Sequence, residues 1–357
     1  MAYSGTVGTT VVTVQQFIDQ GARLSGKLAE ELTVEQVQGS QQALFFVLSN
    51  LINQGINYWA INKQVYGFLP NQYEYLLPVG GVDVLNALYR TMTRPSGAYS
   101  ASDGSSTNNI ADGNITTYNQ MTTANGSYQV YYGTTNTQYI GSIGFMPYIS
   151  GGGSATWSYY LQSSPDGTNW TTLYTATAVT VISGQWVFQD IDPGANVAYY
   201  RIQAFNGTTL ALYEFYLGTN STEITMARLN RDDYTNLPNK NFTANQPYQY
   251  WFNRTLPQSK ITLWPTPSNP FVQMTIWYSR QVDDVGTLTN QLEIPQRWNQ
   301  AIQYLLAHQM SLILPQVEQG RIAYLETQAE KYFIMAENEE RDKSPIYFSP
   351  NIGVYTK

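Results

Sequence analysis

Few residues in this chain could do chemistry. His308 is the only histidine and there is no cysteine, so thiolate nucleophiles and thiolate metal sites are excluded. A general base needs an oriented partner, and no carboxylate lies three or four residues from His308 along its expected helix. We therefore interpret His308 as a residue of helix packing or of an interface.

The remaining polar clusters also have structural explanations. Asp283-Asp284 are adjacent carboxylates that point apart on a strand, whereas glycoside cleavage needs two carboxyl groups at a defined separation. Asn230 followed by Asp232-Asp233 is typical of a helix N-terminus, with Asn230 as the capping residue. Gly151-Gly152-Gly153 predicts a loop, because no GK[ST] motif follows it. The sequence thus predicts no enzyme: no catalytic residue, no cofactor and no metal site.

The composition limits the partners. Charged residues make up 12% of the chain, the net charge is −7, and there are 29 tyrosines. A protein that binds duplex DNA would need a basic stripe, which is missing here. Tyr and Trp without interleaved Lys or Arg favour sheets and protein interfaces over base stacking. The longest apolar run, residues 43–48, is far shorter than the ~20 residues of a membrane span, and the N-terminus lacks the features of a secretory signal. We expect no membrane contact and assembly in a cytoplasm.

Both ends of the chain carry helix signals. Thr13 with Gln16 and Thr33 with Gln36 are two capping boxes, each followed by apolar residues at helical spacing. Residues 57–77 alternate in the manner of a hairpin. In the C-terminal part, residues 260–278 predict a strand pair, and helices follow Pro295 and span about residues 317–341.

The middle of the chain differs in composition and period. Residues 96–220 contain one Arg, Arg201, against six acids, and no Lys. Short alternating strands separated by turns predict an antiparallel β-sandwich or jelly roll. Asp166-Gly167 is read as a tight turn, Trp170 as a cover of one sandwich end, and Tyr200 as part of a central strand.

The predicted fold class is therefore α+β. A discontinuous helical-bundle domain with a small β-sheet would consist of residues 1–95 and 221–343. The sandwich, residues 96–220, would be an insert, and residues 344–357 an extended C-terminal arm. Insertions of this kind are tolerated at surface loops whose ends lie close together.

The discontinuous domain resembles the head-to-tail adaptors of tailed bacteriophages, also called tail accessory factors or packaged-DNA stabilisation proteins. The resemblance rests on motifs in one order: TVQQFIDQGARLSGKL, LSNLINQGINYWAINKQ, LNRDDYTNLPNK, YWFNR, KITLWPTPSNP, MTIWYSRQVDD and LEIPQRWNQAIQYLLAHQM. It implies a structural protein of the virion neck or tail that links the portal protein to the tail and helps retain packaged DNA. It also implies a ring of about twelve copies, a dodecamer, through which DNA passes without sequence-specific binding.

The insert resembles discoidin-like sandwiches, the coagulation factor type C or galactose-binding-like group. The motifs that carry this resemblance are NNIADGNITTYNQ, YYLQSSPDGTNWTTLYT and YYRIQAFNGTTLALYEFYLG. It implies loops that bind sugars or other surface groups, although no binding residue transfers because those loops vary. The insert would decorate the ring or contact tail nozzle, tail tube, fibre or host-surface components. The alternative function is a carbohydrate-binding tail or attachment protein.

The C-terminal arm is the predicted interface with the portal or a neighbouring subunit. Two prolines prevent continuation of the preceding helix, yet the arm is too apolar for a free disordered tail. The residues expected at this interface are Pro345, Ile346, Phe348, Ile352, Val354 and Tyr355.

Overall fold

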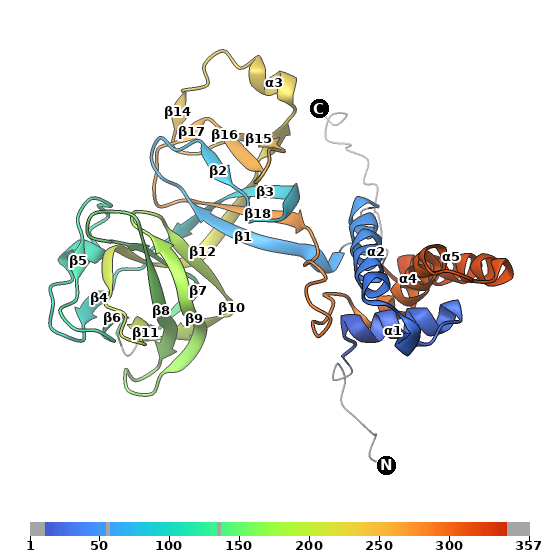
Figure 1. The fold of residues 1–357 in the computed structure, drawn as a ribbon. Helices are drawn as coiled ribbons and strands as arrows, with labels where there is room; N and C mark the ends of the chain where they lie inside the picture. Colours follow the sequence, from blue (N-terminus) through green and yellow to red (C-terminus); the bar gives the residue numbers. More distant parts are fainter. Residues whose placement is uncertain (1–10, 55–57, 134–136, 341–357) are drawn as a thin grey trace, which may run out of the picture. The chain divides into compact units, whose positions relative to one another are not determined.

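The computed structural model describes residues 11–54, 58–133 and 137–340. The chain divides into two compact units, one made of Met1–Ile61 with Ser279–Lys357 and the other of Asn62–Tyr278 (Figure 1). The first unit is helical and contains both ends of the chain, and the second is built of strands. The α+β class predicted from the sequence is confirmed. None of the helices in the described ranges has the length and apolar character needed to cross a bilayer.

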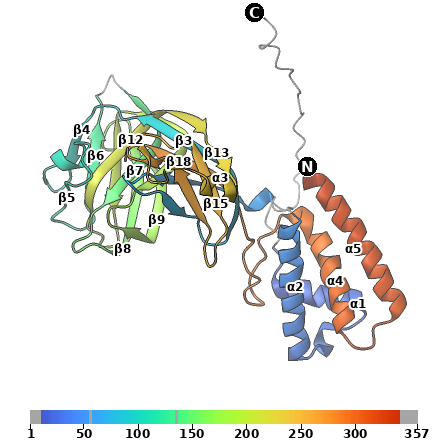
Figure 2. The same ribbon diagram turned by 90° about the horizontal axis from the view of Figure 1, so that it is seen from above.

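Four long helices form the first unit, and α4 packs against each of the other three. Figure 2 shows α2, α4 and α5 running side by side. The helices are α1 (Val14–Ser25), α2 (Val34–Asn53), α4 (Asn299–Ile313) and α5 (Gln319–Glu340), with the 3-10 turns η1 (Ala29–Glu31), η2 (Tyr58–Ala60) and η4 (Gln296–Trp298). Their shared core is centred on the fully buried Trp298 and includes Phe17, Leu44 and Ile302.

Helix α1 begins where the sequence predicts. The Gln16 amide donates to Thr13 Oγ1 at 3.3 Å and the Thr13 amide donates to Gln16 Oε1 at 3.0 Å, which completes the capping box. The two preceding helical amides would also lack intrahelical partners. Val14 N donates to Asn290 O and Gln15 N to Leu288 O, both at 3.0 Å. The C-terminal half of the chain therefore completes the cap of the first helix.

The second unit contains an antiparallel sandwich within residues 96–220, as predicted. One sheet has the order β4-β6-β11-β8-β9, and the other contains β5, β12, β7 and β10. Their facing side chains form one core that includes Tyr128, Trp157, Ile202 and Phe215. The strands are β4 (Ala98–Ala101), β5 (Asn119–Gln120), β6 (Ser127–Tyr131), β7 (Gln138–Pro147), β8 (Ser154–Ser164), β9 (Thr171–Ile182), β10 (Val187–Val197), β11 (Tyr199–Ala204) and β12 (Ala211–Thr225); η3 is Asn108–Ile110.

Strands that precede and follow the sandwich segment in the sequence form a second core, which includes Phe68, Tyr89, Ile261 and Met274. β1, β18 and β3 extend the sheet of β12, β7 and β10 to the order β1-β18-β3-β12-β7-β10, and a separate sheet runs β13-β15-β16-β2. Their strands are β1 (Ile61–Gly67), β2 (Glu74–Leu76), β3 (Gly81–Thr93), β13 (Ala227–Leu229), β15 (Gln249–Asn253), β16 (Lys260–Trp264) and β18 (Gln273–Arg280); the short α3 (Arg231–Thr235), β14 (Thr243–Ala244) and β17 (Thr266–Pro267) accompany them.

Two predicted strand pairings are wrong. The hairpin over residues 57–77 does not form, because β1 pairs with β18 and β2 pairs with β16 in another sheet. The strand pair within residues 260–278 does not form either, since β16 and β18 belong to different sheets. Alternation fixes which side chains face a core but not which strand lies alongside. Both segments are strands, but their partners are distant in the sequence.

Strand β12 belongs to both parts of the second unit. Its first half pairs with β7, from Leu212 to Gly218, and its second half pairs with β3, from Thr219 to Thr225. The sandwich is thus joined to the flanking sheet through a continuous strand. The predicted boundaries of the adaptor domain, insert and arm stay a prediction, and the compact units group the flanking strands with the sandwich.

Two arginines reinforce this junction: Arg90 is buried and Arg94 is partly buried. Arg90 of β3 donates to both carboxylate oxygens of Asp190 in β10, at 2.7 and 2.8 Å, and to Glu223 at 3.0 Å. Arg94, directly after β3, donates to Oε2 of the fully buried Glu214 at 2.9 Å. Each arginine therefore holds a carboxylate of the sandwich segment from a residue outside it.

Candidate functional site

The residues predicted at the portal or subunit interface, Pro345, Ile346, Phe348, Ile352, Val354 and Tyr355, lie outside the described residues. Asn230 is the N-cap of α3, and its Oδ1 accepts from the Asp233 amide at 2.7 Å. Asp283 is exposed and lies 3.4 Å from Arg280. Gly151-Gly152-Gly153 form the exposed turn between β7 and β8, all with positive φ, and a strand follows them. The assignments of Asn230 and of the glycine turn are confirmed. The expected strand position of Asp283 and Asp284 is wrong: β18 ends at Arg280, and the Asp283 amide donates to Glu293 Oε2 at 3.1 Å instead of to a neighbouring strand.

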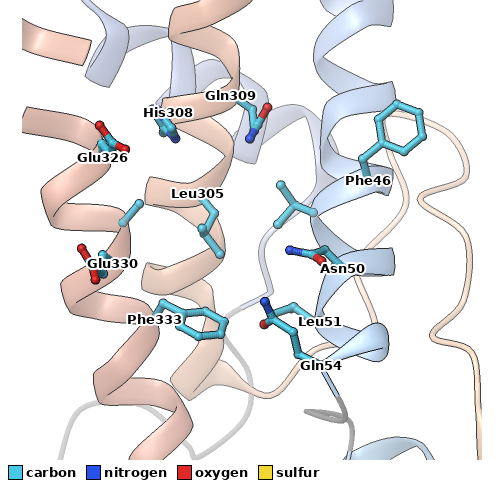
Figure 3. A pocket seen from close by; sticks show the side chains of 12 residues that line it. Phe46, Asn50, Leu51, Gln54, Leu305, His308, Gln309, Glu326, Glu330 and Phe333 are labelled. Carbon is cyan, nitrogen blue, oxygen red and sulfur yellow. The ribbon is translucent and has the colours of Figure 1, made fainter. Parts of the chain in front are cut away.

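The helical unit contains a groove of about 640 Å³ between α2, α4 and α5 (Figure 3). Its lining combines apolar side chains, among them Leu51, Leu305 and Phe333, with side-chain amides, carboxylates and His308. Figure 3 places His308 of α4 beside Glu326 of α5. No carboxylate lies at helical spacing from His308 in the sequence, and Glu326 lies on another helix, so sequence spacing could not identify this neighbour. The lining residues are Phe46, Val47, Asn50, Leu51, Gln54, Leu305, His308, Gln309, Glu326, Ala329, Glu330 and Phe333.

Large apolar side chains remain exposed on the same helices. Phe46 is 58% exposed, Leu312 61% and Met335 57%. Single exposed apolar residues are ordinary, but several on neighbouring helices of one unit are typical of a protein interface. The helical unit therefore offers a surface suited to assembly.

A different surface lies on the outer face of the sheet β4-β6-β11-β8-β9. Arg201 of the central strand β11 lies with its guanidinium carbon 3.9 Å from the centre of the Trp170 ring. Its Nε donates to Gln162 Oε1 at 2.7 Å, and Gln162 Nε2 in turn donates to Thr172 Oγ1 at 3.0 Å. Gln129, opposite Arg201 on β6, donates to Ser100 Oγ at 3.0 Å. A ladder of polar side chains thus crosses all five strands.

Two stacked tyrosines lie next to this ladder. Tyr131 of β6 and Tyr199 of β11 are direct cross-strand partners, and their ring centres are 4.5 Å apart. Tyr199 precedes Arg201 by two residues on the same strand, so both side chains project from the same face. Both rings are partly exposed. The outer face therefore combines aromatic surface, amides and one cation.

The turn at one end of this face confirms the prediction for Asp166-Gly167. Asp166 Oδ1 accepts from the amides of Thr168 and Asn169 at 2.9 and 2.8 Å. These backbone hydrogen bonds hold the pKa of the Asp166 carboxyl well below its usual range. The carboxylate is committed to its own turn and is not the partner of Arg201.

The chain matches no family model and none of the curated proteins compared with it. Among solved structures it is similar to carbohydrate-binding modules, each matched over nearly its whole length. The module of AlyQ in complex with 4,5-unsaturated mannuronic acid is 17% identical, with 36% of this chain and 99% of that chain covered and a TM-score of 0.30. The family 32 module of NanJ from C. perfringens, in complex with galactose, is 18% identical, with 37% and 99% covered and a TM-score of 0.31.

Proposed function

We propose that the chain is a structural subunit of a head-to-tail adaptor ring in a bacteriophage virion, located in the neck or tail between the portal and the tail proteins. The order of the sequence motifs described above motivates this assignment. The structural observation that carries it is the assembly surface of the helical unit: a groove between three helices that also expose large apolar side chains. Burying such side chains between copies would contribute roughly 25 cal/mol per Å² of apolar surface.

The mass of the assembled protein tests this proposal. Multi-angle light scattering and native mass spectrometry should find a discrete multiple of the 40.2 kDa chain, and negative-stain images should show closed rings. Phe46→Ser and Leu312→Ser should shift the population toward monomer with little change in the melting temperature, because both side chains are already exposed. Val79→Ser, at a residue that is 84% exposed in the other unit, is the matched control and should leave the assembly intact.

A monomer at all accessible concentrations, or rings that form equally well from both helix variants, would contradict the assembly surface. The C-terminal arm is tested separately. Truncation after Arg341 should leave the melting temperature unchanged and weaken attachment to portal-containing heads. Attachment equal to that of the full chain would rule out docking by the arm.

A second function, carbohydrate binding in a tail or attachment protein, is favoured by the outer face of the sandwich. Saccharides present apolar C–H faces and polar hydroxyl edges, which partly exposed aromatic rings and side-chain amides can match. The stacked pair Tyr131 and Tyr199 beside the amide ladder is such a combination. A glycan array probed with the full chain tests this function, and the absence of binding to every glycan would exclude it.

A further inference from the structure

The arginine on the outer face of the sandwich is unusual in its charge environment. Arg201 is the only Lys or Arg within residues 96–220. It is partly buried, and in the described part of the chain it forms no ion pair. Burial lowers its pKa, with no carboxylate to offset the effect. An arginine stays protonated under all ordinary conditions, so this surface holds an uncompensated positive charge.

The two arginines at the sandwich junction provide a comparison within the same unit. Arg90 is bound by Asp190 and Glu223, and Arg94 by Glu214. There, a buried guanidinium is matched by carboxylates of this chain, as electrostatics requires. Arg201 has an aromatic ring and one amide oxygen instead. The carboxylate that would complete its environment is therefore missing among the described residues.

The side chain is also positioned to receive such a group. The Trp170 ring lies against the guanidinium of Arg201 and holds its orientation, and the Nε of Arg201 donates its hydrogen bond to Gln162. None of the described residues accepts a hydrogen bond from the two Nη nitrogens of Arg201. A guanidinium edge with free donors matches a carboxylate through two parallel hydrogen bonds, and such pairs are among the strongest polar contacts.

The rest of the face favours a saccharide over other anions. β11 is hydrogen-bonded to β6 on one side and β8 on the other, so its backbone has no groups left to pair with a peptide strand. One cation in a chain of net charge −7 disfavours a polyphosphate such as nucleic acid. A sugar matches the other side chains of this face. Its C–H surfaces suit the rings of Tyr131 and Tyr199, and its hydroxyls suit the amide of Gln129.

We propose that the outer face of β6, β11 and β8 binds a carboxylate-bearing saccharide, with the Nη atoms of Arg201 holding the carboxylate and Tyr131 and Tyr199 contacting the adjoining sugar ring. This inference rests on the second proposed function, carbohydrate binding, and adds to it the location of the site and the acidic class of the ligand.

The probes are oligogalacturonate and its methyl ester, which keeps the sugar skeleton but removes the charge. Isothermal titration should find the acid form bound at least 10-fold more tightly than the ester by the full chain. Arg201→Met should reduce affinity for the acid form about 10-fold or more, to the level of the ester. Arg201→Lys should give an intermediate loss, since lysine keeps the charge and loses the two-pronged contact.

Arg254→Met is the matched control, because it removes the same charge from an arginine whose side chain is 64% exposed elsewhere in the unit. It should leave both affinities unchanged. Equal affinity for acid and ester, or unchanged binding by Arg201→Met, would overturn this inference. If neutral glycans are bound and no acidic one is, carbohydrate binding stands and the acidic site fails. If no glycan of either class binds, both fail. Because the acid–ester comparison uses the unmodified chain, it decides the matter even if Arg201→Met does not fold.

Discussion

The ion pair of the partly buried Arg94 with the fully buried Glu214 allows a quantitative test of how the sandwich is held to its flanking strand. Glu214 is fully buried, and Arg94 is the cation that pairs with it at 2.9 Å. Arg94 also donates to the carbonyl oxygens of Ile110 at 3.0 Å and Phe215 at 2.8 Å. Arg94→Met removes these three contacts and the hydrogen bond from Arg94 Nε to the Tyr99 hydroxyl at 3.4 Å, while it keeps a long unbranched side chain.

The expected loss is large because the partner charge stays buried. Removing one member of a buried ion pair costs about 3–5 kcal/mol. In a unit of roughly 200 residues, each kcal/mol lowers the melting temperature by about 2–4 °C, so Arg94→Met should lower it by about 6–20 °C. Replacing both members, in Arg94→Met with Glu214→Leu, should recover much of this loss, since no unpaired charge remains.

The loss should also depend on pH. Burial raises the pKa of Glu214, although Arg94 opposes the shift. The folded state therefore binds this proton more tightly than the unfolded state does, so this group favours folding as the pH falls and opposes it as the pH rises. Without Arg94 the pKa should rise further. The difference between wild type and Arg94→Met should be greatest at alkaline pH and shrink on acidification.

Thermal melts from pH 8 to pH 5, followed by near-UV circular dichroism, measure both effects. Arg254→Met is again the control, because the Arg254 side chain is 64% exposed and ion pairs of exposed side chains contribute at most about 1 kcal/mol. A drop below 2 °C for Arg94→Met, or a difference independent of pH, would refute the reasoning that Arg94 neutralises a buried carboxylate.

Three further predictions follow from the fold. Thr13→Ala removes the cap of α1 and should cost about 1 kcal/mol in chemical denaturation; an unchanged midpoint would contradict the cap's contribution. Burial would raise the pKa of Asp190, but hydrogen bonds from Arg90 and Lys63 lower it to about 2. This carboxylate therefore stabilises the fold at pH above about 4 and loses that effect as the pH falls toward 2, so Asp190→Asn should be destabilised at pH 7 and match wild type near pH 2. Replacing residues 96–220 by a short Gly/Ser linker should retain the far-UV helical signal, and its loss would show that the helices depend on the sandwich.

The sequence predicts what local chemistry determines. The capping boxes at Thr13 and Thr33 place two helix starts because the cap and its partner are only three residues apart. Strand alternation identifies the sandwich for the same reason. The strand partners of β1, β2, β16 and β18 could not be predicted, because pairing across long separations depends on how whole sheets pack.

In the candidate functional surfaces, too, single residues can be identified from the sequence, but their contacts with distant residues cannot. The sequence alone identifies Arg201 as the only cation of its segment, but its position over Trp170 arises only when β11 lies beside β8 and the turn that follows β8. Likewise, Arg90 and Asp190 are 100 residues apart in the chain, and nothing near either residue indicates the other. Contacts of this kind are properties of the assembled fold.

The continuity of β12 has a mechanical consequence. A sandwich tethered by two flexible linkers would reorient freely, and a force applied to it would first extend the linkers before it reached the neighbouring strands. Here the covalent backbone leaves the pairing with β7 at Gly218 and enters the pairing with β3 at Thr219 without an intervening linker. Tension applied to the sandwich would therefore load the hydrogen bonds between β12 and β3 directly, many of them at once and lengthwise along the strands. If the sandwich is bound to a surface, a force applied to it would therefore act as shear on the hydrogen bonds between β12 and β3.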